Sequence, residues 1–76
     1  MNKYAIGNNI CEHLRRNHMS QRQLAERLNN TEVTVSRWCT GTRQPSVYAL
    51  KRMSLLFNCT MEDLTYGLLE EREYDC

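Results

Sequence analysis

The sequence has 76 residues, of which 41% are hydrophobic and 25% are charged, and its formal net charge at pH 7 is +1. This length fits a single domain with a small core, and apolar residues occur only in short runs such as residues 55–57, which excludes a membrane span. The first residues contain no apolar signal-peptide segment, so we expect a cytoplasmic protein.

The small net charge hides an asymmetry along the chain. Residues 1–52 carry nine basic and three acidic side chains, a net charge of +6, whereas residues 53–76 carry one basic and six acidic side chains, a net charge of −5. A basic body with its acidic part turned away is typical of a protein that binds nucleic acid. Chance clustering on a solvated surface is the alternative interpretation.

Capping residues and helical periodicity predict five helices and no strands, and therefore an all-α domain. The first helix is predicted from about residue 6 to residue 17. Within it, Ile6, Ile10 and Leu14 recur at intervals of about one helical turn. These three side chains are therefore expected to form one apolar stripe that faces the core.

Two short helices joined by a tight turn are predicted at residues 20–39. The first begins at the N-cap Ser20, in a capping box, and ends at residues 29–30, because Asn tolerates a left-handed backbone. The second begins at the N-cap Thr31 and stops at Gly41. The side chains expected to point inward from this pair are Leu24, Ala25, Leu28, Val35 and Trp38.

Two further helices and a short tail complete the predicted organisation. The fourth helix is capped by Ser46, and the fifth is capped by Thr60. We expect residues 1–69 to form the domain and residues 70–76 to form an acidic C-terminal tail. The residues expected on the inner faces are Val47, Leu50, Met53, Ser54 and Phe57 in the fourth helix and Leu64 and Leu68 in the fifth.

The helix pair at residues 20–39 has the form of a helix-turn-helix, which lays its second helix in the major groove of DNA. The outward side chains of that second helix are predicted to be Glu32, Val33, Ser36 and Arg37. Arg37 can donate two hydrogen bonds to guanine, Glu32 can accept one from cytosine, and Val33 offers an apolar surface to a thymine methyl group. Each good base contact discriminates by ~1–3 kcal/mol.

Other side chains suit the phosphate groups beside the groove. Gln21 lies at the start of the first helix of the pair, where backbone amides form an anion site. Thr31, Thr42 and Arg43 flank the second helix, where the DNA backbone is expected to pass. Contacts of this kind give affinity without sequence information and make binding sensitive to salt.

Residues 20–28 read S-Q-x-x-L-A-x-x-L and residues 35–38 read V-S-R-W, with Gly41 and Pro45 following. The pattern resembles that of the Cro/lambda-repressor-like (XRE) family of bacterial and phage regulators, and the resemblance covers roughly residues 6–65. It implies a compact five-helix lambda-repressor-like domain that binds operator DNA as a two-fold dimer. The positions that it implies for base contact are Glu32, Val33 and Arg37, with Thr34 as a further one, and for backbone contact Gln21 and Arg43.

The chain departs from the family pattern at three places. Many members pair an Arg in the first helix with a Glu near the end of the third. Leu14 and Cys39 stand there instead, so an apolar contact is expected to replace a buried ion pair. Asn30 stands where members often carry an apolar residue, and Glu32 places a negative charge at the groove.

The leading hypothesis is a sequence-specific transcriptional regulator, bacterial or phage-encoded, that acts as a repressor and binds a palindromic operator as a homodimer. The alternative is an antitoxin whose main partner is a toxin protein, and an antirepressor is another possible protein partner. A protein-interaction domain that has lost DNA binding is a third hypothesis. The residues that could form a dimer patch are Leu55, Tyr66 and Leu69.

No enzyme activity, cofactor or metal is expected. No His, Cys or carboxylate set has the spacing of a nucleophile and its base, and the chain is too short for a substrate cleft. Cys11 and His13 point to different sides of a helix. The four cysteines form no CxxC pair and are expected to be free thiols packed as small apolar groups, with a disulfide framework as the alternative.

Overall fold

The computed structural model describes residues 4–67, which form five α-helices and no strand. The predicted all-α fold is confirmed, and each helix begins and ends close to its predicted bounds. The expectations for Leu68, Leu69 and residues 70–76 lie outside the described residues. In chain order the helices are α1 (Ala5–Arg16), α2 (Gln21–Arg27), α3 (Glu32–Thr40), α4 (Val47–Phe57) and α5 (Met61–Thr65).

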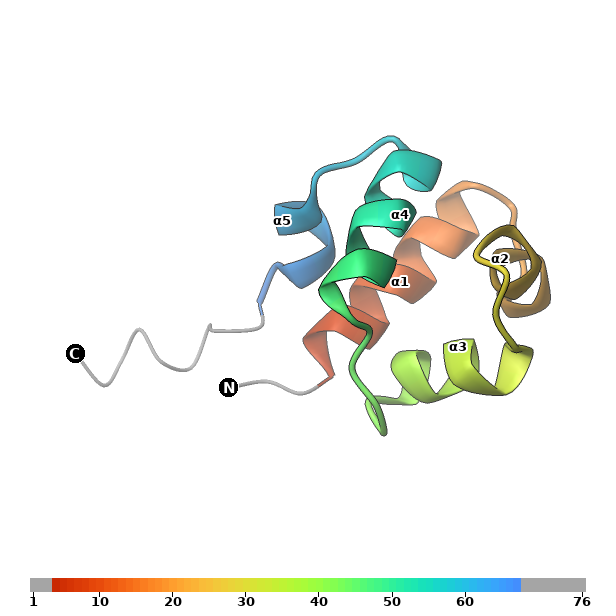
Figure 1. The fold of residues 1–76 in the computed structure, drawn as a ribbon. Helices are drawn as coiled ribbons and strands as arrows, with labels where there is room; N and C mark the ends of the chain where they lie inside the picture. The colour runs from red at the N-terminus through yellow and green to blue at the C-terminus, as the bar shows by residue number, and fades with distance from the viewer. Residues whose placement is uncertain (1–3, 68–76) are drawn as a thin grey trace.

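The arrangement of the helices leaves α3 at the edge of the molecule. Helix α1 packs against α3 and α5, α2 packs against α3, and α4 packs against α5. Figure 1 shows α3 along the lower edge of the view, with α2 above its right-hand end and α4 and α5 on the other side of the domain. Within residues 4–67, every helix is too short or too polar to span a bilayer.

Four of the five helices begin at a side-chain cap. A hydroxyl oxygen of each cap accepts a hydrogen bond from the backbone amide three residues later, which would otherwise have no partner within the helix. Caps of this kind stabilise a helix by roughly 1 kcal/mol each. The four caps are Ser20, Thr31, Ser46 and Thr60, and the first and last form complete capping boxes.

Three helices end in the same left-handed turn. His18, Asn29 and Asn58 have φ angles of 53°, 55° and 55°. In each case the next residue donates its backbone amide to a carbonyl of the last helical turn, as Met19 does to Leu14 over 2.9 Å. Helix α3 ends differently, at Gly41, whose φ of 80° carries no steric penalty because glycine has no Cβ atom. The turn predicted at residues 29–30 is therefore present.

One apolar cluster fills the space between the helices, and each of the five helices contributes to it. Leu14 belongs to this cluster and Cys39 packs against it, as expected for positions that hold no ion pair. The buried apolar residues of the cluster are Ile6, Ile10, Leu14, Leu24, Ala25, Leu28, Val35, Trp38, Leu50, Met53, Phe57 and Leu64.

Two predictions about burial are wrong. Val47 was expected on the inner face of α4, but 73% of it is exposed, because it is the first residue of α4 and the helix joins the core only from Ala49 onward. Cys11 was expected to be packed, but it is exposed on α1. Cys39 and Cys59 are half-buried, and all three of these cysteines are free thiols.

Candidate nucleic-acid interface

Helix α3 packs against the core through one face, and its opposite face is exposed to solvent. Val35 and Trp38 point inward from α3 and are buried in the core. Leu24 and Ala25 of α2 are buried in the same cluster, and the small Ala25 side chain allows the two helices to approach closely. The angle between α2 and α3 is therefore fixed by packing, and this packing determines which side chains of α3 project outward.

The predicted base-reading residues lie on the outer face of α3. Glu32, Val33 and Arg37 are exposed, and 59% of Val33 is accessible although it is an apolar side chain. Val33 and Arg37 are four residues apart, so they lie one above the other on the same face of the helix. Thr34 and Ser36 are half-buried, and their short side chains extend less far from the helix axis.

The hydroxyl groups at the start of α3 are partly committed to each other. The Oγ1 atom of Thr31 accepts a hydrogen bond from the backbone amide of Thr34 over 3.2 Å, and the two Oγ1 atoms lie 2.8 Å apart. Asn30 tightens the same turn, because its Oδ1 atom accepts a hydrogen bond from the Thr31 amide over 2.9 Å. One of the two hydroxyl protons lies in the hydrogen bond between the threonines. Only the other proton can be donated to an outside acceptor.

The predicted phosphate-contacting residues lie around the same helix pair. Gln21 is the first residue of α2 and is half-buried, while Thr42 and Arg43 are exposed in the loop after α3. The backbone amide of Arg43 donates to the carbonyl of Arg37 over 3.2 Å, so the loop folds back onto the end of α3. The Thr42 hydroxyl lies 2.9 Å from that of Thr40, so a phosphate contact by Thr42 competes with this hydrogen bond.

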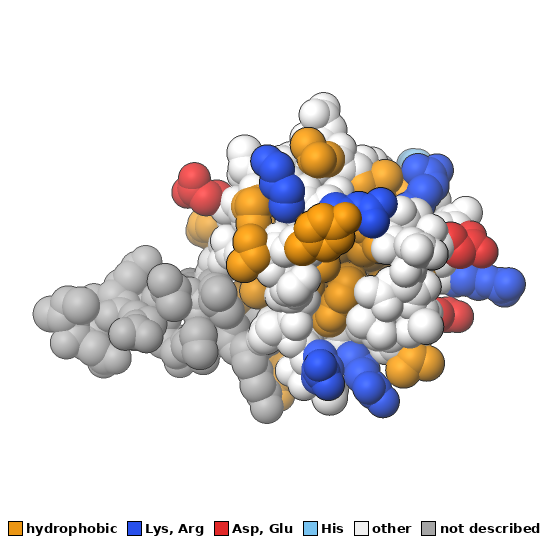
Figure 2. Space-filling view, in the orientation of Figure 1, with side chains coloured by type: hydrophobic (Ala, Val, Ile, Leu, Met, Phe, Trp, Pro, Cys, Tyr) orange, Lys and Arg blue, Asp and Glu red, His pale blue; other side chains and the backbone are white. Residues whose placement is uncertain are grey.

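The cationic side chains near α3 are not neutralised by neighbouring carboxylates. Within residues 4–67 the ion pairs join Glu12 to Arg15 and Arg16 on α1. These contacts hold the pKa of Glu12 below its usual value. Arg37 and Arg43 make no ion pair with a described carboxylate, and Figure 2 shows Lys or Arg side chains at the lower edge of the molecule, where Figure 1 places α3 and the loop that follows it.

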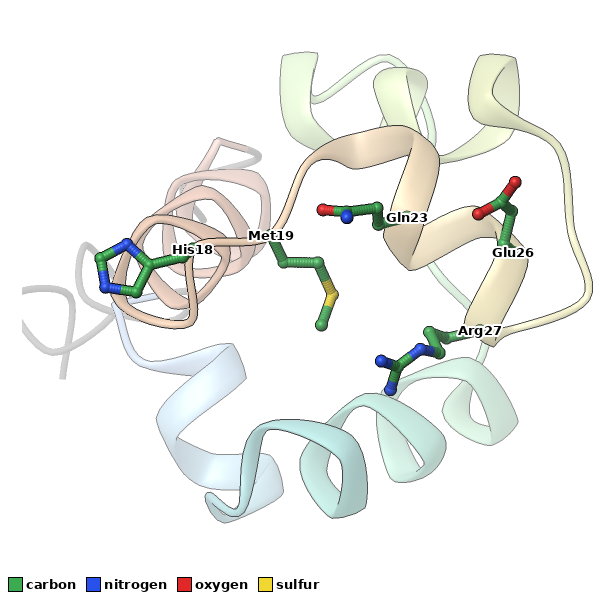
Figure 3. A pocket seen from close by; sticks show the side chains of 5 residues that line it. All are labelled: His18, Met19, Gln23, Glu26 and Arg27. Atoms are coloured by element: carbon green, nitrogen blue, oxygen red, sulfur yellow. The ribbon is translucent and has the colours of Figure 1, made fainter.

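A hollow of about 310 Å³ lies beside α2, and the residues that line it are not among the predicted DNA contacts. Figure 3 shows that His18 points away from the other four side chains, while Arg27 extends toward Met19. Gln23 also lines the hollow, but its side chain is occupied in the capping box with Ser20. This hollow therefore lacks a converging set of catalytic groups. The described residues also contain no cluster of three or more side chains that could hold a metal ion.

Two residues that position the helix pair were not recognised from the sequence. Gly7 lies against the backbone of α3, and its position inside a helix was the available signal, because glycine there weakens the helix and therefore suggests a packing role. Arg52 of α4 donates hydrogen bonds to the carbonyls of Arg27 and Leu28 at the end of α2, over 3.0 and 3.4 Å. No sequence pattern indicates this link, because its partners are backbone atoms of a distant segment.

Comparison with known protein families gives a match over most of the chain. A family model described as helix-turn-helix matches residues 12–64. This region begins within α1, includes the whole of α2, α3 and α4, and ends in α5 at Leu64. Searches among curated proteins and among solved structures found no match to the chain.

Proposed function

The chain belongs to the Cro/C1-type (XRE) helix-turn-helix family, and we propose on this premise that it is a transcriptional regulator that reads a specific DNA sequence with α3. The family is one of DNA-binding domains and not of enzymes. Regulation by such a protein takes place where the DNA is, in the cytoplasm of a bacterial cell. We infer a repressor, since a bound domain of this size blocks access to a promoter without further machinery.

The outward face of α3 is the observation that carries this proposal. Arg37 and Val33 project from one side of a helix whose other side is buried, and the Arg37 guanidinium has no carboxylate partner among the described residues. An arginine in this position suits the two acceptor atoms of guanine, and a valine suits the methyl group of thymine. Glu32, Thr34 and Ser36 are proposed as further base contacts on the same helix.

Phosphate contacts are proposed for the residues around α3. Arg43 is exposed and lies beside the end of α3, where its charge can reach the DNA backbone. Gln21, Thr31 and Thr42 are proposed to donate hydrogen bonds to phosphate oxygens. Together these contacts would fix the register of α3 in the groove without reading sequence.

A two-fold homodimer is proposed because one α3 reads too few base pairs for a specific operator. A dimer would place two copies of α3 one turn of DNA apart, about 34 Å, and would require a palindromic operator. Two large apolar side chains support a dimer surface on the packed pair α4 and α5, since Leu55 is 70% exposed and Tyr66 is 79% exposed.

Selection of bound sequences from a random DNA pool tests the proposal directly. We expect a palindromic motif to be enriched, with half-sites separated by about one helical turn. Binding to the enriched duplex should exceed binding to scrambled duplex by roughly a thousandfold or more. A pool that shows no enrichment while the protein binds every duplex equally would contradict sequence-specific regulation.

The substitution Arg37→Ala tests the role of α3. Losing a base contact of ~1–3 kcal/mol in each of the two half-sites should weaken binding to the selected operator by roughly 30-fold or more and relax the preference at one base pair of each half-site. Arg16→Ala is the matched control, because it also removes one positive charge but lies on α1 in an ion pair with Glu12. Equal losses in the two variants would mean that Arg37 acts only through its charge.

A further inference from the structure

A close approach between the backbones of α1 and α3 brings two cysteines near each other. A Cβ atom added to Gly7 would lie 2.4 Å from the carbonyl oxygen of Trp38 and 2.6 Å from that of Cys39, so the two helix backbones touch at this point. Cys11 is four residues after Gly7, on the same side of α1. Cys39 belongs to the last turn of α3, and both thiols are free.

The two thiols lie near enough to interact, and they differ in their environment. Cys11 is exposed, whereas Cys39 is half-buried and packs against the apolar core. Burial, together with a hydrogen-bonding interaction with the Cys11 thiol and its charge, raises the pKa of Cys39 to about 12. At neutral pH Cys39 is therefore a protonated thiol, and Cys11 is the member of the pair that an oxidant in solution can reach.

We propose that Cys11 and Cys39 are an oxidation site, at which a hydroperoxide converts the two thiols into a disulfide that joins α1 to α3. The thiol of Cys59, the remaining cysteine of residues 4–67, interacts with the carboxylate of Asp63 and not with another described thiol. Among the described cysteines, the pair that the fold places near each other is therefore Cys11 and Cys39.

The reaction proceeds in two steps. The Cys11 sulfur attacks one oxygen of the hydroperoxide, the O–O bond breaks, and the departing oxygen takes up a proton, which leaves a sulfenic acid on Cys11. The Cys39 sulfur then loses its proton and attacks the Cys11 sulfur, and the S–O bond breaks as hydroxide leaves and takes that proton to form water. Two thiols are oxidised, and hydrogen peroxide is reduced to two molecules of water.

The disulfide would restrain α3, the helix that binds DNA in the proposed function. The loop it closes includes all of α2 and most of α3, so it restricts the unfolded chain while joining side chains that already meet in the folded domain. Formation of the bond is a property of the thiols alone. It can therefore be tested without DNA and independently of the proposed function.

The test uses the full chain with Cys59→Ser and Cys76→Ser, which retains only the proposed pair. The reduced protein is treated with hydrogen peroxide, digested without reductant and analysed by mass spectrometry. We expect one peptide pair linked through Cys11 and Cys39 within a monomer, and its release by dithiothreitol. A product that is linked between two molecules, or that carries only sulfinic acid on Cys11, would overturn the proposal.

Two further measurements test the order of the two steps and whether the folded domain accommodates the disulfide. The variant Cys39→Ser should accumulate a sulfenic acid on Cys11 that dimedone captures, whereas Cys11→Ser should react much more slowly. The oxidised form should have a thermal midpoint higher than the reduced form by roughly 10 °C or more. A lower midpoint after oxidation would overturn the inference that the folded contact accommodates the bond. The natural sequence, with all four cysteines, should give the same linkage as its main intramolecular product.

Discussion

At the scale of single residues, Gly7 controls how closely two helices meet. A glycine inside a helix costs roughly 1 kcal/mol relative to alanine, so an isolated α1 would be more stable with alanine there. In the folded domain the space for a Cβ atom is already taken by backbone carbonyl oxygens of Trp38 and Cys39. Backbone atoms of a packed helix cannot turn aside as a flexible side chain can, so the glycine has no good replacement.

We therefore expect Gly7→Ala to destabilise the protein although it improves helix propensity. Moving α1 away from α3 should lower the free energy of unfolding by about 1–3 kcal/mol. Urea denaturation followed by the fluorescence of Trp38, the single Trp of the chain, measures the change. Asn8→Ala is the control, because Asn8 is the exposed neighbour on the same helix. The glycine would have no packing role if both substitutions stabilised the domain equally.

At the scale of helices, left-handed residues end α1, α2 and α4 with different side chains. Asn29 and Asn58 have this conformation, which asparagine tolerates better than most residues because its short polar side chain can hydrogen-bond locally. His18, with the same positive φ, has the steric cost of a Cβ atom without that compensation. The end of α1 is therefore the least favourable of the three.

This difference predicts that His18→Gly raises the free energy of unfolding by roughly 0.5–1 kcal/mol. The steric cost of the Cβ atom disappears, and the greater freedom of glycine in the unfolded chain offsets part of the gain. Asn58→Gly is the matched control and should change stability by less. Thermal unfolding of both variants gives the comparison, and a fall in the midpoint for His18→Gly would contradict the steric argument.

The sequence predicted the helices well because their ends depend on local chemistry. Caps at Ser20, Thr31, Ser46 and Thr60 each accept a hydrogen bond from a residue three positions away, so the signal lies within one turn. Val47 was placed wrongly because periodicity indicates which face of a helix is apolar but not where the neighbouring helices end. The link from Arg52 to the end of α2 and the meeting of Cys11 with Cys39 depend on distant segments, and a single sequence carries no local signal for either.

At the scale of the whole molecule, the described residues keep part of the charge asymmetry of the chain. Residues 4–67 contain eight Lys or Arg and five Asp or Glu, a net charge of +3. Exposed positions on α3 could be predicted from the sequence, because burial of Val35 and Trp38 determines which face remains outside. The sequence could not predict which cations contact bases and which contact phosphates, because these roles depend on where the duplex lies. Salt dependence separates the two roles.

Each cation that neutralises a phosphate releases counterions, so the logarithm of the binding constant falls with the logarithm of salt concentration by about 0.9 per contact. A bidentate contact to guanine reads a base edge and leaves this slope nearly unchanged. In a two-fold dimer Arg43 occurs twice, so we expect Arg43→Ala to reduce the slope by about 2 and to weaken binding to all sequences alike. Arg37→Ala should keep the slope of the unsubstituted protein and lose discrimination at one base pair.

The measurement is a series of binding isotherms on selected and scrambled duplexes between low and physiological salt. Arg43 lies in a loop whose backbone donates a hydrogen bond to the last turn of α3, so removing its side chain should leave α3 in place. An unchanged slope in Arg43→Ala would remove Arg43 from the phosphate contacts. If Arg37→Ala instead flattens the slope and keeps the base preference, then α3 lies along the backbone rather than in the groove, and the outward face of this helix binds DNA without reading it.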